Sequence, residues 1–112
     1  MATISPSYLG GGTLTGSAAA YATASGTSTL ILKNVVFTNT DSVARTITVH
    51  RVPSGGSATT GNMVISALSL SAGQTYNATE VLGNMILTPG ATLQALASTG
   101  GVVNLFISGL TA

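Results

Sequence analysis

The sequence predicts an all-β fold, an antiparallel β-sandwich that is Ig-like or jelly-roll-like, with a flexible Gly-rich N-terminal arm. Segments rich in β-branched and aliphatic residues recur along the chain, and Gly, Pro, Asn, Asp or Ser separate them. No segment reads convincingly as a helix. At 112 residues the chain is expected to form one domain, with the arm over residues 1–16 and the sandwich over residues 17–112.

The expected arm, residues 1–16, contains few apolar side chains and three consecutive glycines, Gly10, Gly11 and Gly12. Glycine allows backbone paths that other residues avoid, so ordering this segment costs conformational entropy that its own contacts do not return. The arm is therefore expected to be mobile in the isolated chain and to become ordered on a partner.

Two strands are expected after the arm. Residues 17–24 are compatible with a short helix, but Tyr21, Thr23 and the following Gly26 favour a weak edge strand. Residues 27–40 give the strongest strand pattern, because apolar side chains fall on both faces. This strand should be central in its sheet, or half covered by another subunit.

The next strand is expected over residues 44–52, after turn residues 39–42. Thr46, Thr48 and His50 alternate there with Ile47, Val49 and Arg51, which is typical of a half-buried strand. Pro53 ends it, and residues 54–62, with three glycines, are expected to form a long flexible loop at one tip of the fold.

The second half of the chain contains two similar strand–turn–strand segments, residues 70–78 and 87–95, offset by 17 residues. Each has a turn dipeptide, Ala72-Gly73 or Pro89-Gly90, whose glycine suits a type II turn. Convergence on one turn solution is favoured over duplication, because a solenoid needs at least three units. The last strand is expected over residues 102–110, with Val103, Leu105 and Ile107 on one face and Val102, Phe106 and Leu110 on the other.

Charged side chains are rare. The chain has three Lys or Arg and two Asp or Glu residues, for a net charge of +1. An ordinary soluble domain has about a quarter of its residues charged. Sheet edges are normally guarded by charges or proline, and few charges are available here. The sequence therefore predicts that partner chains cover the edges and that the protein assembles.

Composition excludes several classes of site. Without cysteine there is no disulfide and no thiolate metal site, and one histidine with two acids cannot supply an ordinary zinc site. Mean hydropathy is +0.54, but no apolar run reaches about 18 residues, so a soluble chain without a membrane span is expected. No export signal is visible at its start. No cofactor or metal is expected.

The candidates for catalysis are weak. His50 is the only plausible general base, and a strand histidine that faces solvent or a neighbouring subunit is the favoured interpretation. Asp41 and Glu80 are the only pair of carboxylates, and Asp41 is better explained as a turn-capping acceptor. The glycines at positions 10–12 lack the lysine and the strand-to-helix context of a phosphate loop. No catalytic residue is predicted.

Nucleic-acid binding is not expected, because it needs clustered cations. Arg45 and Arg51 are better explained as partners of carboxylates or carbonyls on a neighbouring subunit. Tyr8, Tyr21 and Tyr76 could stack on sugars or bases, but aromatic side chains are also enriched at protein interfaces.

Several segments together resemble small structural proteins of tailed bacteriophages, over roughly residues 27–110. They are VFTNT at residues 36–40, TITVHRVPSGG at 46–56, LSAGQTY at 70–76 and LQALA at 93–97. Proteins of this kind are sandwich domains that decorate (cement) capsids or belong to tails and fibres. The resemblance implies a structural virion protein without catalytic residues, and it does not cover the arm.

The expected function is that of a capsid decoration protein on the outer surface of the virion, assembled in the host cytoplasm. Its expected partners are the major capsid protein and copies of itself, as a homotrimer, with no nucleic acid and no membrane. The alternative within structural proteins is a tail, baseplate or fibre component, with contact to host-surface glycans. An enzyme would need a catalytic constellation that the sequence does not contain.

Overall fold

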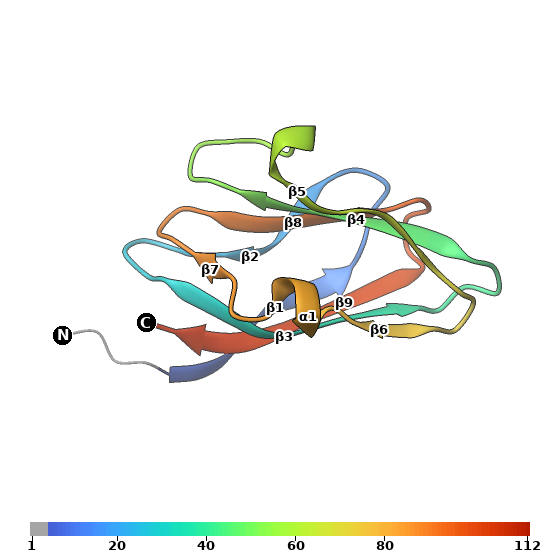
Figure 1. Ribbon diagram of the computed structural model, residues 1–112, viewed down its shortest axis with the longest axis horizontal. Helices are drawn as coiled ribbons and strands as arrows, with labels where there is room; N and C mark the ends of the chain where they lie inside the picture. Colours follow the sequence, from blue (N-terminus) through green and yellow to red (C-terminus); the bar gives the residue numbers. More distant parts are fainter. Residues whose placement is uncertain (1–4) are drawn as a thin grey trace.

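The computed structural model describes residues 5–112, which form two antiparallel sheets packed face to face (Figure 1). Sheet A contains β1 (Ser5–Thr13), β9 (Val103–Thr111), β3 (Leu30–Asn39) and β6 (Thr75–Asn77) in that order, and β7 (Ile86–Leu87) also pairs with β3. Sheet B contains β2 (Ala19–Thr23), β8 (Thr92–Ala97), β4 (Arg45–Val52) and β5 (Met63–Leu70). The predicted antiparallel β-sandwich is confirmed. Within the described residues, no helix is long and apolar enough to cross a membrane.

The core lies between the two sheets and follows from the alternation of side chains along each strand. On β3, Leu32, Val35 and Phe37 point inward, and on β9 the predicted set Val103, Leu105 and Ile107 does the same; all six are fully buried. In sheet B the inward side chains include Ile47, Val49, Leu70, Leu93 and Ala95. These interlocking apolar rows hold the two sheets together.

Strand β3 is central in sheet A, as expected, but only one of its faces is covered. A register shift between Leu32 and Asn34 places Lys33 in a bulge, so the apolar residues on either side of it fall on one inward row. Ile31 and Val36 point outward and are half-buried. The chain alone therefore leaves an apolar outer surface on this strand.

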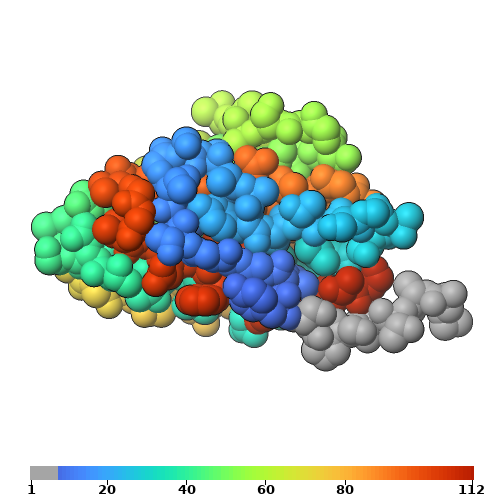
Figure 2. Space-filling view, turned by 180° about the vertical axis from the view of Figure 1, so that it is seen from behind, coloured from blue at the N-terminus to red at the C-terminus, as the bar shows by residue number. Residues whose placement is uncertain are grey.

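The expected flexible arm is corrected for residues 5–16. Ser5–Thr13 form strand β1, which pairs with β9 along its length, and Leu14 is fully buried in the core. Residues 1–4 lie outside the described part of the chain. Figure 2 shows the face opposite to that in Figure 1, where the blue N-terminal strand lies along the surface beside the red C-terminal segment.

The glycines explain why β1 fits there. A Cβ built on Gly10 would lie 1.8 Å from the carbonyl oxygen of Tyr21 on β2, and one on Gly11 would lie 2.3 Å from that of Leu105. Gly10 has φ +157°, which side chains disfavour. The glycines thus allow β1 to approach β2 and β9 closely. From composition alone, the same glycines had indicated a flexible segment.

The other expected elements are present with small changes. The weak strand over 17–24 is β2, an edge strand, and the tip loop over 54–62 ends in a single 3-10 turn, η1 (Thr60–Asn62). Both predicted tight turns form, with hydrogen bonds from Gln74 N–H to Ser71 O and from Ala91 N–H to Thr88 O. The short α-helix α1 (Thr79–Leu82) was not predicted, and its last residue, Leu82, is buried in the core.

The sheet edges are short or irregular. Strand β6 has three residues, and the pairings of β1, β2 and β5 each contain a register shift. Short or bulged edges are poor templates for another strand. The geometry of the edges therefore limits strand pairing with other chains, which the few charges do not do. Coverage of the edges by partner chains stays a prediction.

Candidate functional site

The outer face of sheet A is the candidate interaction surface. Strand register places its side chains in rows across the sheet, because residues paired in antiparallel strands point to the same side. One row joins Leu110, Ile31 and Ile86 on strands β9, β3 and β7. A second joins Tyr8, Ser108 and Asn34, and a third contains Phe106 and Val36.

This outer face is unusually apolar for a surface. Tyr8 is 66% exposed, Phe106 54% and Ile86 49%, while Ile31, Val36 and Leu110 are half-buried. Exposed apolar residues scattered singly are ordinary, but a contiguous patch marks a contact site.

Charge is nearly absent from the same face. Its three apolar and polar rows contain no ionisable side chain other than the phenol of Tyr8. The one charged side chain in the strands of sheet A is Lys33, which is exposed at the β3 bulge between Ile31 and Asn34 and donates a hydrogen bond to Asn84 Oδ1. A partner of this face therefore needs no opposite charge.

The polar row has unused hydrogen-bonding capacity. Among residues 8–112, whose side chains the structure describes, no hydrogen bond joins the side chains of Tyr8, Ser108 or Asn34 to another protein group, whereas the neighbouring Asn104 accepts one from Thr13 Oγ1 at 2.9 Å. A phenol, a hydroxyl and an amide can each both donate and accept. This row can therefore pair with polar groups of a partner.

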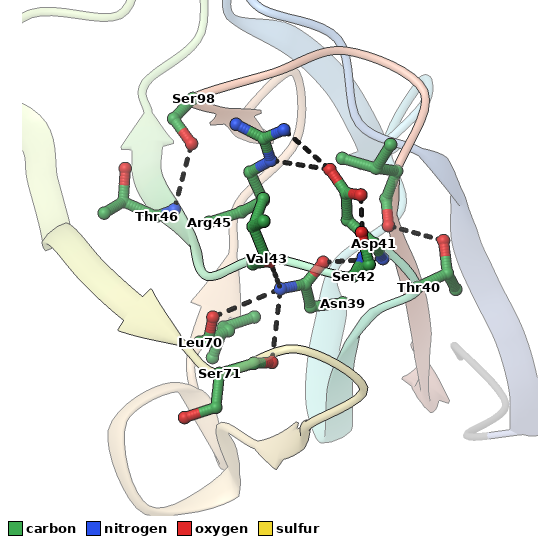
Figure 3. A network of polar contacts seen from close by, with 11 residues as sticks. Asn39, Thr40, Asp41, Ser42, Val43, Arg45, Thr46, Leu70, Ser71 and Ser98 are labelled. Carbon is green, nitrogen blue, oxygen red and sulfur yellow. Dashed lines mark hydrogen bonds and ion pairs between the residues drawn. The ribbon is translucent and has the colours of Figure 1, made fainter.

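A second polar cluster lies at the β3–β4 connection and is structural (Figure 3). The buried Asn39 side chain donates to the carbonyl oxygens of Val43, Leu70 and Ser71 at 3.0, 3.1 and 3.2 Å. Its own oxygen accepts from the N–H of Asp41 at 3.0 Å. One side chain thus fixes the connection and ties it to the end of β5.

Asp41 has the turn-capping role predicted for it. Its carboxylate accepts from Arg45 Nε at 2.8 Å and from the N–H of Ser42 at 2.7 Å. These two hydrogen bonds lower the pKa of the Asp41 carboxyl below its ordinary value. Glu80 is exposed on α1, and the ion pair of Asp41 is the one found within residues 5–112. Asp41 and Glu80 therefore lie on different elements, and no hydrogen bond or ion pair joins them among the described residues.

The two arginines bond a carboxylate and a carbonyl, but within their own chain. Arg45 pairs with Asp41, and Arg51 donates through Nε and Nη2 to the carbonyl oxygen of Ile86 at 3.0 and 2.8 Å. Contacts of these arginines with a neighbouring subunit stay a prediction. Arg51 links sheet B to β7 of sheet A and so holds Ile86 in place at the border of the outer face.

His50 is 5% exposed, so the part of the prediction that has it facing solvent is wrong, and contact with a neighbouring subunit is untested. Its Nδ1 lies 3.0 Å from the carbonyl oxygen of Thr59 and 3.0 Å from Asn62 Oδ1. Both neighbours are acceptors, so a hydrogen on Nδ1 satisfies them. The histidine anchors the tip loop to β4. Within the described residues, no three His, Asp or Glu side chains gather as metal ligands.

The three tyrosines do not form one platform. Tyr21 donates to the carbonyl oxygen of Thr13 at 3.2 Å, and Tyr76 pairs with Phe37 and packs against the core. Of the three, Tyr8 lies on the outer face, where its row is next to the row of Phe106. The sequence had placed Phe106 on the second face of the last strand, but it gave no signal for Ile86, whose strand has two residues.

Comparison with known proteins gives no family. No family model matches the sequence. No curated protein matches it at a significant level. Among solved structures, the chain is similar to a chain in the structure of infectious bursal disease virus Gt strain, with a TM-score of 0.45 and 13% identity. A chain of the Gx strain structure is similar with a TM-score of 0.36 and 23% identity. Each match covers 97% of this chain, which spans 30% and 28% of the two viral chains.

Proposed function

We propose that this chain is a non-enzymatic structural protein of a virion, a capsid decoration protein that binds the assembled head of a tailed phage. The observation that carries the proposal is the outer face of sheet A, in which two apolar rows flank an uncharged polar row and Lys33 is the one charged side chain in the strands. Such a face is costly to leave in water, so it suits a protein that works in an assembly. The sequence resemblance to phage structural proteins supplies the kind of assembly.

The proposed mechanism is mass action. A protein that binds the closed shell, but not the separated shell subunits, stabilises the shell by an amount set by its affinity and free concentration. Many symmetric copies on one particle add avidity without new contacts. The partners are the major capsid protein and further copies of this chain as a homotrimer, on the outside of the capsid. No step of this mechanism needs a catalytic residue.

The ionisable side chains that were weighed for catalysis or binding already form hydrogen bonds within the fold. Asp41 caps a turn, His50 holds the tip loop, and Arg51 bonds a backbone carbonyl. These roles support a structural protein over an enzyme. The alternative location, in a tail, baseplate or fibre, uses the same properties and differs in the partner.

The test is a reconstitution on particles. Shells that lack the protein are incubated with the purified chain, freed of unbound protein and heated, and the rupture temperature is measured by light scattering. We expect saturable binding and a higher rupture temperature, and His50→Gln should bind equally. Binding to tails and not to shells would move the protein to the alternative location, and binding to neither would refute a virion role.

A further inference from the structure

We infer that the outer face of sheet A is the interface between copies of this chain, with Phe106 near the symmetry axis. This inference deepens the proposed function and rests on it in one respect, that the protein works as an assembly. It names the occupants of the apolar face as further copies of this chain, whose outer faces meet around the symmetry axis. The argument depends on charge, hydrogen-bonding pattern, size and the state of the sheet edges.

Charge favours a copy over most other partners. A symmetric interface brings equivalent groups of the copies close together, so any charge in it meets a like charge. Like charges across an interface are costly. The three rows contain no Lys, Arg, Asp or Glu, and the exposed Lys33 beside them is hydrogen-bonded to Asn84 within its own chain, so this penalty is small. The chain's two ion-paired charges, on Asp41 and Arg45, lie at the β3–β4 connection instead.

The polar row is able to pair with itself. Tyr8, Ser108 and Asn34 lie side by side on three neighbouring strands, between two apolar rows. Since each of these side chains both donates and accepts, one copy of the row can satisfy another. The aliphatic side chains Ile31, Val36 and Leu110 on either side would exclude water from these hydrogen bonds.

The size of the face fits a contact between copies. Strands β1, β9 and β3 each run about 30 Å, and the short β6 and β7 together fill part of a fourth position; with strands about 4.8 Å apart, the footprint is roughly 500 Å² before side-chain relief is added. A standard protein interface buries about 800 Å² on each partner. Phe106 lies on β9, between β1 and β3, and aromatic residues near the centre of an interface tend to carry its energy.

The edges make the alternative route to self-association less favourable. Strand addition needs a regular edge, and the edges of both sheets are short or contain register shifts. Contact through a face needs no free backbone groups. Packing of the outer faces around a common axis therefore avoids the need for a regular strand edge.

The chain is well suited to a crosslinking test because it has no cysteine. We would prepare Phe106→Cys and, as a control, Val43→Cys; Val43 is 49% exposed and lies on the β3–β4 connection, outside the outer face. Under a mild oxidant at equal concentrations, Phe106→Cys should form a covalent pair at least tenfold faster than Val43→Cys. Equal rates for the two variants would overturn the inference.

The mass of the particle in solution gives a second, independent readout. Light scattering after size exclusion should give the wild-type chain a multiple of 11.0 kDa, with about 33 kDa for a trimer. Phe106→Ser combined with Val36→Ser should shift it to the monomer with an unchanged circular dichroism spectrum, and Val43→Ser should not. A wild-type monomer at tens of micromolar would refute the interface. Binding of maltohexaose by that monomer, lost in Tyr8→Ala, would assign the face to a glycan instead.

Failure of this inference is distinguishable from failure of the proposed function. A chain that self-associates through Phe106 but binds no shell would retain the interface and lose the virion role. A monomer that binds and stabilises shells would do the reverse.

Discussion

Asn39 is the buried polar side chain on which the β3–β4 connection depends. It is fully buried and satisfies three carbonyl oxygens and one N–H. Asn39→Ala should lower the free energy of unfolding by about 2–3 kcal/mol, because buried carbonyls lose their donor. The measurement is urea unfolding with an unchanged m-value. Val43→Ala, on the same connection but 49% exposed and outside the outer face, is the control and should change stability by less than about 0.5 kcal/mol.

Asp41 makes the acid sensitivity of the chain easy to assign, because the sequence has only two side-chain carboxylates. Its pKa is lowered in the folded state by Arg45 and by the N–H of Ser42. The folded chain thus holds the proton less tightly than the unfolded chain, so the stabilisation is complete above the unfolded value, about 3.9, and is lost as pH falls through the folded pKa.

The expected result is a melting temperature that falls below about pH 4 in the wild type. Asp41→Asn should begin from a slightly lower value at pH 7 and depend less on acid, while Glu80→Gln should follow the wild type. The check is differential scanning fluorimetry from pH 7 to pH 2.5. If Glu80→Gln, and not Asp41→Asn, flattened the profile, the assignment to Asp41 would fail.

At the scale of the element, β1 shows what glycine contributes to this fold. Gly10→Ala should destabilise the chain by about 1–3 kcal/mol or release β1, because the added Cβ would overlap the Tyr21 carbonyl. Hydrogen exchange of the β9 amides that face β1 should rise with it. Gly16→Ala is the matched control, since a Cβ there meets no atom within 4 Å. Equal behaviour of the two variants would contradict this account of β1.

Most elements could be predicted from local patterns, and the misses share a cause. Alternation and turn dipeptides located β2, β3, β4, β8 and β9, because each signal lies within a few residues. The arm was misread because the close approach of Gly10 to Tyr21 is a contact between strands and leaves no local trace. Ile86 and the burial of His50 depend in the same way on distant segments. The sequence predicted part of the outer face, because Phe106 and Leu110 were placed together on the second face of the last strand.

At the scale of the molecule, the scarcity of charge and the apolar outer face both favour association through that face. Five charged side chains give little electrostatic repulsion between copies, and Arg45, Arg51 and Asp41 are engaged in internal contacts. Short and bulged edges limit uncontrolled strand pairing at the same time. Association is thereby directed to a face whose side chains are set by strand register.

This design predicts how association responds to salt. Contacts between charged groups weaken as ionic strength rises, whereas burial of apolar surface does not, and excluded salts such as sulfate strengthen it. Sedimentation equilibrium at 50 and 500 mM sodium chloride should therefore give association constants that agree within about twofold, and 300 mM sodium sulfate should raise the constant. Phe106→Ser should lower the constant at every salt concentration without changing this insensitivity. An association constant that fell tenfold between the two chloride concentrations would mean that charged groups, and not the outer face of sheet A, hold the copies together.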